Sequence, residues 1–281
     1  MTLFLMIEKL PPGLYIVATP IGNLSDLSPR AADILARADL IAVEDSRVTA
    51  KLLHHIGVRR PMLPYHDHNG ERVRPQLLDR MRDGSVALVS DAGTPLISDP
   101  GYKLVRDARE AGIRVTTIPG PSAVVAALTL AGLPTDRFLF LGFLPPKPGA
   151  KSAAIAEAAT VRATLVLYES GPRLAATLLA LREGLGEREA AVAREISKKF
   201  EETVTGTLSF LAERYSEAPP KGEIVIVVAP PGEAEAACEE QVDEALREAM
   251  GRLSASRAAA EVAEKLGVPR RQAYERALKL K

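Results

Sequence analysis

The sequence has 281 residues, a length that suggests about two domains at roughly 150 residues each. Lys plus Arg and Asp plus Glu both number 36, so the formal net charge is zero and no overall field draws the chain to a polyanion. The hydrophobic fraction of 47% and the charged fraction of 26% are typical of a globular protein. They exclude disordered, collagen-like and coiled-coil chains.

Cysteine usage and apolar runs restrict the compartment. Cys238 is the only cysteine, so no intrachain disulfide and no cysteine-based zinc or iron–sulfur site can form. We expect a cytoplasmic protein with no metal, because a chain without disulfides suits a reducing compartment. The longest apolar stretch, residues 123–133, is too short to cross a bilayer, so a membrane is not expected as a partner.

In residues 11–134, short apolar runs alternate with helical patterns. Strand–loop–helix units of this kind predict a mostly parallel sheet with helices on both faces. The expected strands are 14–18, 40–43, 86–90 and 113–118. The expected helices are 29–36, 48–56, 101–111 and one that ends near residue 131.

Residues 135–231 have a different pattern. The expected strands are 138–143, 164–168, 190–195, 203–207 and 222–229, and the expected helices are 150–159, 172–182 and 208–215. The last strands are closely spaced, which predicts some antiparallel pairing. We therefore expect an α/β fold with two α/β domains and a ligand-binding cleft between them.

The last 50 residues are divided by charge. Residues 232–250 hold seven acids and one base, whereas residues 251–281 hold eight bases and three acids. We expect an acidic connector and then a small helix–turn–helix-like hairpin with helices at 254–266 and 270–280. The hairpin is either a solvated basic face or a nucleic-acid contact. The expected RNA-binding residues there are Arg270, Arg271 and Arg276.

Four loops rich in small and polar residues follow expected strands, at 18–28, 44–47, 90–101 and 118–123. At one edge of a parallel sheet they would let backbone groups approach a ligand closely. None matches G-x-G-x-x-G or a P-loop, which argues against a dinucleotide or nucleoside-triphosphate site. The acid–Gly–Pro character of residues 90–101 suits a ligand that carries positive charge.

Two further polar segments have several interpretations. Residues 65–69 contain His66 and His68 on either side of Asp67. The segment is a polar loop, a partial metal site, or a source of substrate-contacting and acid–base groups. Residues 194–202 are either a solvated strand end or a cationic rim for an anionic substrate.

These loops together resemble one family. The chain is similar to the RsmI family of ribosomal small-subunit RNA (cytidine-2′-O-)-methyltransferases, within the tetrapyrrole-methylase superfamily. The resemblance covers residues 11–230, and the basic hairpin is a further match. The first loop, ATPIGNL, differs from the GxGPGD type of the tetrapyrrole-methylating enzymes. The motifs that carry the resemblance are VATPIGNLSDLS, EDSR, YHDHNG, SDAGTPLISDPG, IPGPSA, DRFLFLGFLP, LYESGPR, REISKKFEE and KGEIVIVV.

The resemblance implies a class III methyltransferase that binds S-adenosyl-L-methionine between two α/β domains. It implies methyl transfer to the ribose 2′-hydroxyl of a cytidine in the decoding region of 16S rRNA, with the rRNA or the small ribosomal subunit as partner, and a homodimer. The positions that match the family's cofactor-binding stretches, with the first of them near the substrate side, are Pro20, Ser90, Asp91, Ala92, Gly93, Ile97, Ser122, Ala123, Tyr168, Ala193, Glu223 and Ile224.

The chemistry of methyl transfer suggests catalytic roles. A neutral ribose hydroxyl is a poor nucleophile, so a general base would help. Asp45 and His66 are the candidates, because each lies in a loop that should face the cleft. Arg47, Lys198 and Lys199 are expected to hold the phosphates that flank the target.

Two other functions remain open. A tetrapyrrole C-methyltransferase is disfavoured by the first loop and by the basic tail. A non-enzymatic nucleic-acid-binding regulator is disfavoured by the four-loop cleft.

Overall fold

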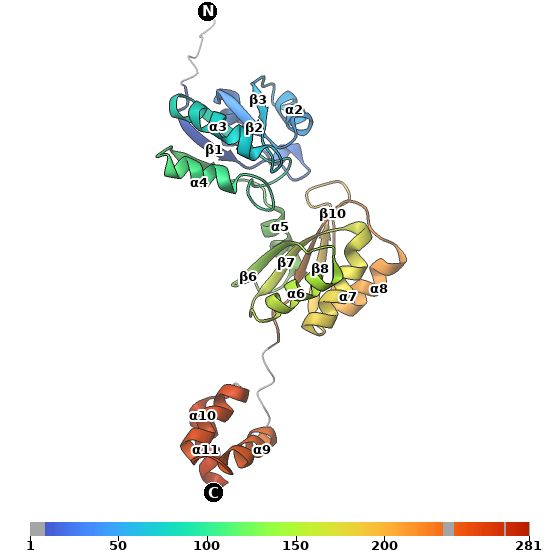
Figure 1. The fold of residues 1–281 in the computed structure, drawn as a ribbon. Helices are drawn as coiled ribbons and strands as arrows, with labels where there is room; N and C mark the ends of the chain where they lie inside the picture. Colours follow the sequence, from blue (N-terminus) through green and yellow to red (C-terminus); the bar gives the residue numbers. More distant parts are fainter. Residues whose placement is uncertain (1–8, 233–238, 267, 281) are drawn as a thin grey trace, which may run out of the picture. The chain divides into compact units, whose positions relative to one another are not determined.

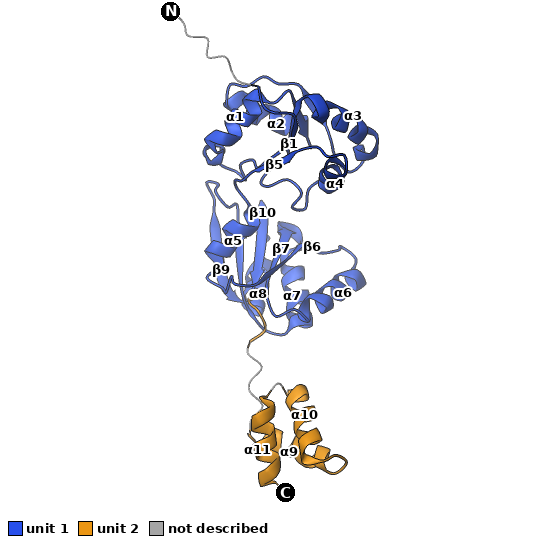
Figure 2. Ribbon diagram, turned by 90° about the vertical axis from the view of Figure 1, so that its left-hand side faces the viewer, with its two compact units in different colours: residues 1–228 blue, residues 229–281 orange. Residues whose placement is uncertain are grey.

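The computed structural model describes residues 9–232, 239–266 and 268–280. The chain divides into two compact units, Met1–Val228 and Ala229–Lys281, which are coloured separately in Figure 2. No helix in the described part of the chain is long and apolar enough to span a membrane.

The first sheet of unit 1 is entirely parallel, as predicted. Its strands are β1 (Gly13–Val17), β2 (Leu40–Val43), β3 (Met62–Pro64), β4 (Ser85–Val89) and β5 (Val115–Ile118). Their order is β3-β2-β4-β1-β5, and every pair runs in the same direction. Because the strands are parallel, the loops that follow them emerge at one edge.

Helices cover both faces of this sheet (Figure 1). They are α1 (Pro29–Arg37), α2 (Ser46–His55), α3 (Gly70–Asp83) and α4 (Tyr102–Glu110), and a 3₁₀ turn, η1, spans Leu24–Asp26. Helices α1 and α2 contribute to one core cluster and α3 and α4 to another. The sequence analysis did not predict β3 or α3.

The second sheet of unit 1 is mixed. Its strands are β6 (Phe138–Phe143), β7 (Thr164–Ser170), β8 (Glu189–Arg194), β9 (Glu202–Thr207) and β10 (Glu223–Val228). Their order is β6-β7-β10-β8-β9. Only the β6–β7 pair among them is parallel, so the predicted antiparallel pairing is confirmed.

The second sheet is buried on both faces as well. Helices α6 (Pro148–Ala159), α7 (Leu174–Leu185) and α8 (Leu208–Glu217) pack on one face, and the 3₁₀ turn η2 spans Gly171–Arg173. Helix α5 (Ala123–Ala131), which follows β5 of the first sheet, packs on the other face through Val124 and Leu128. Helix α5 therefore belongs in sequence to the first sheet and in packing to the second.

The described part of unit 2 contains the helices α9 (Glu239–Met250), α10 (Ala255–Leu266) and α11 (Arg270–Lys279). The two expected helices of the hairpin are α10 and α11. The segment expected as an acidic connector forms, over residues 239–250, a helix of the same core. Val242, Leu246 and Ala249 recur on one side of α9 and are buried against the other two helices.

Candidate functional site

Hydrogen bonds join the loops at the carboxyl edge of the first sheet. Thr19, after β1, donates its N–H to the carbonyl of Gly93 at 2.9 Å, and the N–H of Gly93 donates to the carbonyl of Thr19 at 3.0 Å. The N–H of Asp45, after β2, donates to Asp91 Oδ1 at 3.0 Å. The predicted gathering of the loops at this edge is therefore present in the structure.

The loop after β4 is held in an unusual conformation. Leu96 and Ser98 have positive φ angles of 76° and 65°, which cost about 1–2 kcal/mol per non-glycine residue. The hydroxyl of Thr94 donates to the carbonyl of Pro121 at 3.0 Å and fastens this loop to the one after β5. Strain of this kind concentrates at ligand sites.

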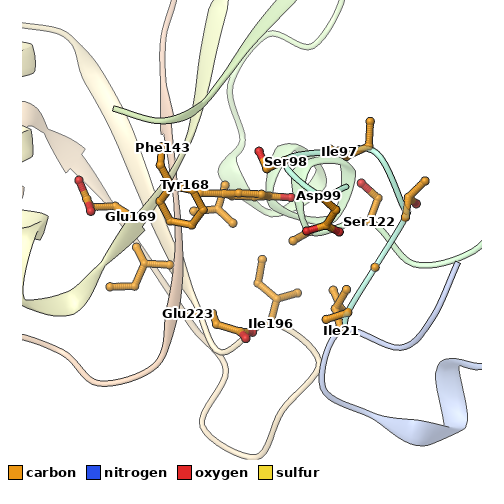
Figure 3. A pocket seen from close by; sticks show the side chains of 16 residues that line it. Ile21, Ile97, Ser98, Asp99, Ser122, Phe143, Tyr168, Glu169, Ile196 and Glu223 are labelled. Carbon is orange, nitrogen blue, oxygen red and sulfur yellow. The ribbon is translucent and has the colours of Figure 1, made fainter. Parts of the chain in front are cut away.

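A cavity of about 220 Å³ lies between these loops and the second sheet. In Figure 3, Ile97, Ser98, Asp99 and Ser122 face Tyr168 and Phe143 across it. The lining residues are Ile21, Ala92, Gly93, Thr94, Ile97, Ser98, Asp99, Ser122, Ala123, Phe143, Tyr168, Glu169, Ile196, Glu223, Ile224 and Val225.

Eight of the twelve expected cofactor-binding residues line this cavity, namely Ala92, Gly93, Ile97, Ser122, Ala123, Tyr168, Glu223 and Ile224. The other four are placed around it. Pro20 and Ser90 are buried in the loops, Asp91 bonds to the backbone of Asp45, and Ala193 is buried in the cluster that contains Tyr168.

The cavity is acidic. Its charged lining residues are Asp99, Glu169 and Glu223, and no Lys or Arg is among the described residues that line it. The carboxylate of Glu169 is already bonded to Thr177 at 2.6 Å and lies 3.3 Å from Arg173. Glu223 is paired with Lys198 Nζ at 2.9 Å, so Asp99 is the lining carboxylate that has no ion pair with a described Lys or Arg, and it favours a cationic ligand.

The titration of two facing groups reflects this environment. Burial raises the pKa of Asp99 and Asp91 adds to the rise, although a hydrogen bond with Ser90 opposes it. Burial, with Asp99 and Glu223 nearby, raises the pKa of Tyr168 to about 12. Tyr168 is therefore a neutral phenol at neutral pH.

Sequence reasoning missed several of these groups. Asp99 lies in the loop at 90–101 that was singled out, and Glu169 and Ile196 lie within the motifs LYESGPR and REISKKFEE, but none of the three was assigned to the site. Glu44 begins the EDSR motif, and burial raises its pKa, with Asp99 and Asp91 adding to the rise. The available signals were the position of Glu44 and Glu169 at or just beyond the ends of buried strands and the place of Asp99 in the turn-rich loop at 90–101.

Asp45 and Arg47, two of the expected catalytic residues, bond to each other. Asp45 Oδ1 accepts from the backbone N–H of Arg47 at 2.8 Å and so caps helix α2, and Asp45 Oδ2 lies 2.6 Å from Arg47 Nη2. The hydrogen bonds from the Arg47 side chain and backbone lower the pKa of Asp45 to about 2. A carboxylate of such low basicity is poorly suited to accept a proton from a ribose hydroxyl.

His66 lies in the loop after β3, at the same edge of the sheet. The backbone N–H of His66 donates to Asn69 Oδ1 at 2.9 Å, and the centroid of its ring is 5.9 Å from that of His68. Its Nδ1 is buried without a hydrogen-bond partner among the described residues. Within that same part of the chain, no group of three or more His, Cys, Asp or Glu side chains is arranged to hold a metal ion.

The expected RNA-binding lysines have different environments. Lys198 Nζ lies 3.0 Å from Glu195 and 2.9 Å from Glu223. Burial tends to lower the pKa of Lys198, but the hydrogen bonds to the two carboxylates outweigh it and raise the pKa. Lys199 is exposed and lies over the ring of Phe200, 5.6 Å from its centroid.

The expected arginines of unit 2 differ in the same way. Arg276 is 2.7 Å from Glu239 and 2.7 Å from Asp243, so it ties α11 to the acidic helix α9. Arg270 and Arg271 are exposed at the start of α11, where Arg271 pairs with Glu275 along the helix. Arg276 therefore forms ion pairs within unit 2, whereas Arg270 forms none with the described residues.

Comparison with known proteins identifies the family. Residues 13–212 match the model described as Tetrapyrrole (Corrin/Porphyrin) Methylases, and residues 236–281 match the RsmI C-terminal HTH domain. A protein of Erythrobacter litoralis called Ribosomal RNA small subunit methyltransferase I is 51% identical, with 98% of this chain and 97% of that protein covered. A protein of the same name from Mesorhizobium japonicum is 50% identical, with 98% and 94% covered.

A solved structure shares the fold of unit 1. Uroporphyrin-III C-methyltransferase from Thermus thermophilus, in complex with S-adenyl homocysteine, aligns with a TM-score of 0.54 at 23% identity and covers 76% of this chain and 96% of its own. With near-complete coverage by relatives at about half identity, the chain belongs to the tetrapyrrole (corrin/porphyrin) methylases and, within them, to the ribosomal RNA small subunit methyltransferase I family.

Proposed function

We propose that this protein is an S-adenosyl-L-methionine-dependent methyltransferase that methylates the ribose 2′-hydroxyl of a cytidine in the decoding region of 16S rRNA. The main support is the match to relatives named Ribosomal RNA small subunit methyltransferase I over 98% of the chain. The resemblance of the loop motifs to the RsmI family adds the ribose hydroxyl and the cytidine. The loop-built cavity is the proposed reaction site.

The cavity suits the proposed cofactor. S-adenosylmethionine carries a sulfonium and an ammonium group, and Asp99 supplies negative charge with no ion pair to a described Lys or Arg, whereas Glu223 is shared with Lys198. The side chains of Phe143 and Tyr168 offer an apolar surface for a flat adenine ring. Ala92 and Gly93 leave their backbone open to close approach. When bound, the cofactor supplies an electrophilic methyl group on its sulfonium sulfur.

The remaining work of the site is positioning and proton transfer. The ribose oxygen must approach the methyl carbon in line with the departing sulfur, so most of the catalysis is orientation. We assign the general base to His66, because its loop follows β3 at the same edge of the sheet as the loops that line the cavity and because Asp45 is a weak base. Asp45 and Arg47 then serve to start helix α2 and to present a guanidinium that is 89% exposed to a phosphate.

The wider assignments belong to the same proposal. Residues 11–134 and 135–231 form the two walls of the site, and residues 232–281 contact RNA through Arg270 and Arg271. Lys199 is a second RNA contact, whereas Lys198 and Arg276 support their neighbours through ion pairs. The protein acts in the cytoplasm as a homodimer on the 16S rRNA or the small subunit.

Two measurements test the proposal. Isothermal calorimetry should show binding of S-adenosylhomocysteine, and transfer of labelled methyl groups to unmethylated 30S subunits should place the label on a cytidine ribose. Labelling of a porphyrinogen instead of rRNA would favour a tetrapyrrole methyltransferase. Absence of any cofactor binding would favour a non-enzymatic regulator.

A further inference from the structure

A second hollow lies next to the proposed cofactor cavity in unit 1. It is a groove of about 600 Å³ whose lining comes from the end of β8 and the loop after it, from β9, from α8 and from the connection between α8 and β10. Glu195 and Gly222 line the groove, whereas the next residues, Ile196 and Glu223, line the cavity. Figure 3 shows Ile196 and Glu223 together on the cavity side of this wall. The same two segments therefore contribute to the lining of both the groove and the cavity.

The wall of the groove carries more positive than negative charge. One carboxylate, Glu202, lies 2.6 Å from Arg194 and 3.5 Å from Arg214. The side chain of Arg214 is 48% exposed, so this longer pair is open to exchange with another anion. Lys221 is exposed at the rim, with no ion pair to another described residue.

Aromatic groups complete the groove. Phe200 is 65% exposed, so its ring is accessible to a ligand. Tyr215 is 5% exposed, and its hydroxyl lies within reach of the Arg214 side chain. The groove thus offers an exposed aromatic ring and a lining with one more cation than carboxylates.

The loop that carries Phe200 is fixed by its own contacts. Glu195 and Ser197 have positive φ angles of 50° and 67°. The hydroxyl of Ser197 donates to Asp26, and Lys198 bonds to Glu195 and Glu223. Ordering the loop in advance reduces the entropy lost when a ligand binds.

We infer that this groove binds an unpaired nucleotide of the RNA substrate, with its base stacked on Phe200 and its neighbouring phosphates held by Lys199, Arg214 and Lys221. The inference rests on the proposed function, because it assigns part of the RNA substrate to this surface. Unpaired bases stack on exposed aromatic rings and their phosphates pair with Arg and Lys.

The experiment compares Phe200→Ala and Phe200→Trp with Phe210→Ala, a control on a ring that is 47% exposed and does not line the groove. With unmethylated 30S subunits as the probe, Phe200→Ala should raise KM by about 5- to 150-fold, as loss of one stacked base predicts. The kcat value and the affinity for S-adenosylhomocysteine should be unchanged. Phe200→Trp should retain the wild-type KM.

A second pair of variants tests the phosphate contacts. Lys221→Gln should weaken binding to 30S subunits and reduce the slope of log affinity against log salt by about 0.7, the value for one contact to a single strand. Arg162→Gln, an exposed cation just before β7, should change neither quantity.

The outcomes separate the two proposals. A wild-type KM in Phe200→Ala, or an equal rise in Phe210→Ala, overturns the groove assignment while methyl transfer by the wild-type protein stands. A wild-type protein that transfers no methyl group to 30S subunits overturns the proposed function and the groove with it.

Discussion

The close contact of Gly93 with the cavity wall gives the sharpest prediction. Gly93 has a φ of 80°, and a Cβ atom at this position would lie 3.3 Å from Ile21 Cγ2, which also lines the cavity. Gly93→Ala therefore combines a backbone cost of about 1–2 kcal/mol with a shift of the wall by a few tenths of an ångström. A displacement of about 1 Å in an active site can lower the reaction rate about a hundredfold. For the smaller displacement here we expect about a tenfold loss of affinity for S-adenosylhomocysteine.

Gly112→Ala separates the two effects. Gly112 has a φ of 70°, and a Cβ atom there would contact nothing within 4 Å. Both variants should lower Tm by about 2–8 °C, because 1 kcal/mol shifts a domain of this size by about 2–4 °C. Only Gly93→Ala should lose cofactor affinity in calorimetry. Equal affinity in the two variants would refute the assignment of Gly93 to the cofactor wall.

Three further predictions concern the base, the acidic cavity and unit 2. His66→Ala should lower kcat by about 10²–10⁴-fold and leave S-adenosylhomocysteine binding intact; an unchanged single-turnover rate would exclude His66 as the base. Because burial raises the pKa of Asp99, its carboxyl ionises at a higher pH than an ordinary Asp, so affinity for the cationic S-adenosylmethionine should rise with pH through that titration. Calorimetry of Asp99→Asn should show a flatter pH profile, and an identical profile would contradict the role of Asp99. Truncation after Val228 should weaken 30S binding but not cofactor binding. Truncation after Met250 should also cause aggregation, measured by light scattering, because it exposes Val242 and Leu246 to solvent. A monodisperse protein that ends at Met250 would contradict the packing of unit 2.

The sequence analysis predicted those elements whose burial produces a clear apolar pattern. Strands β1, β2 and β4 are continuous apolar runs because helices cover both faces of a parallel sheet. Strand β3 escaped prediction because it is a three-residue edge strand that ends in Pro64 and is only half buried. Helix α3 escaped because charged residues and an internal Pro75 obscure its buried Val73, Leu77 and Met81.

The site was predictable to the extent that it depends on loops after strands. Turn-rich segments at the ends of parallel strands meet at one edge, which is why residues 90–101 and 118–123 were found. The partners contributed by the second sheet, such as Phe143 and Ile196, depend on how the two sheets face each other, and no local pattern encodes that. The segment of α9 was interpreted as a connector because of its acidic residues. Two of those acids pair with Arg276 and hold α9 against α11.

The loop at 195–201 also connects the two sheets of unit 1. Ser197 bonds to Asp26, and the stem of Lys198 lies against Gly22, so a loop of the second sheet fastens the first loop of the other. A hinge rotation that admits or releases a cofactor would have to break these contacts. Because Phe200 lies two residues beyond Lys198, RNA stacked on Phe200 would oppose that rotation. The methylated RNA would then leave before the spent cofactor.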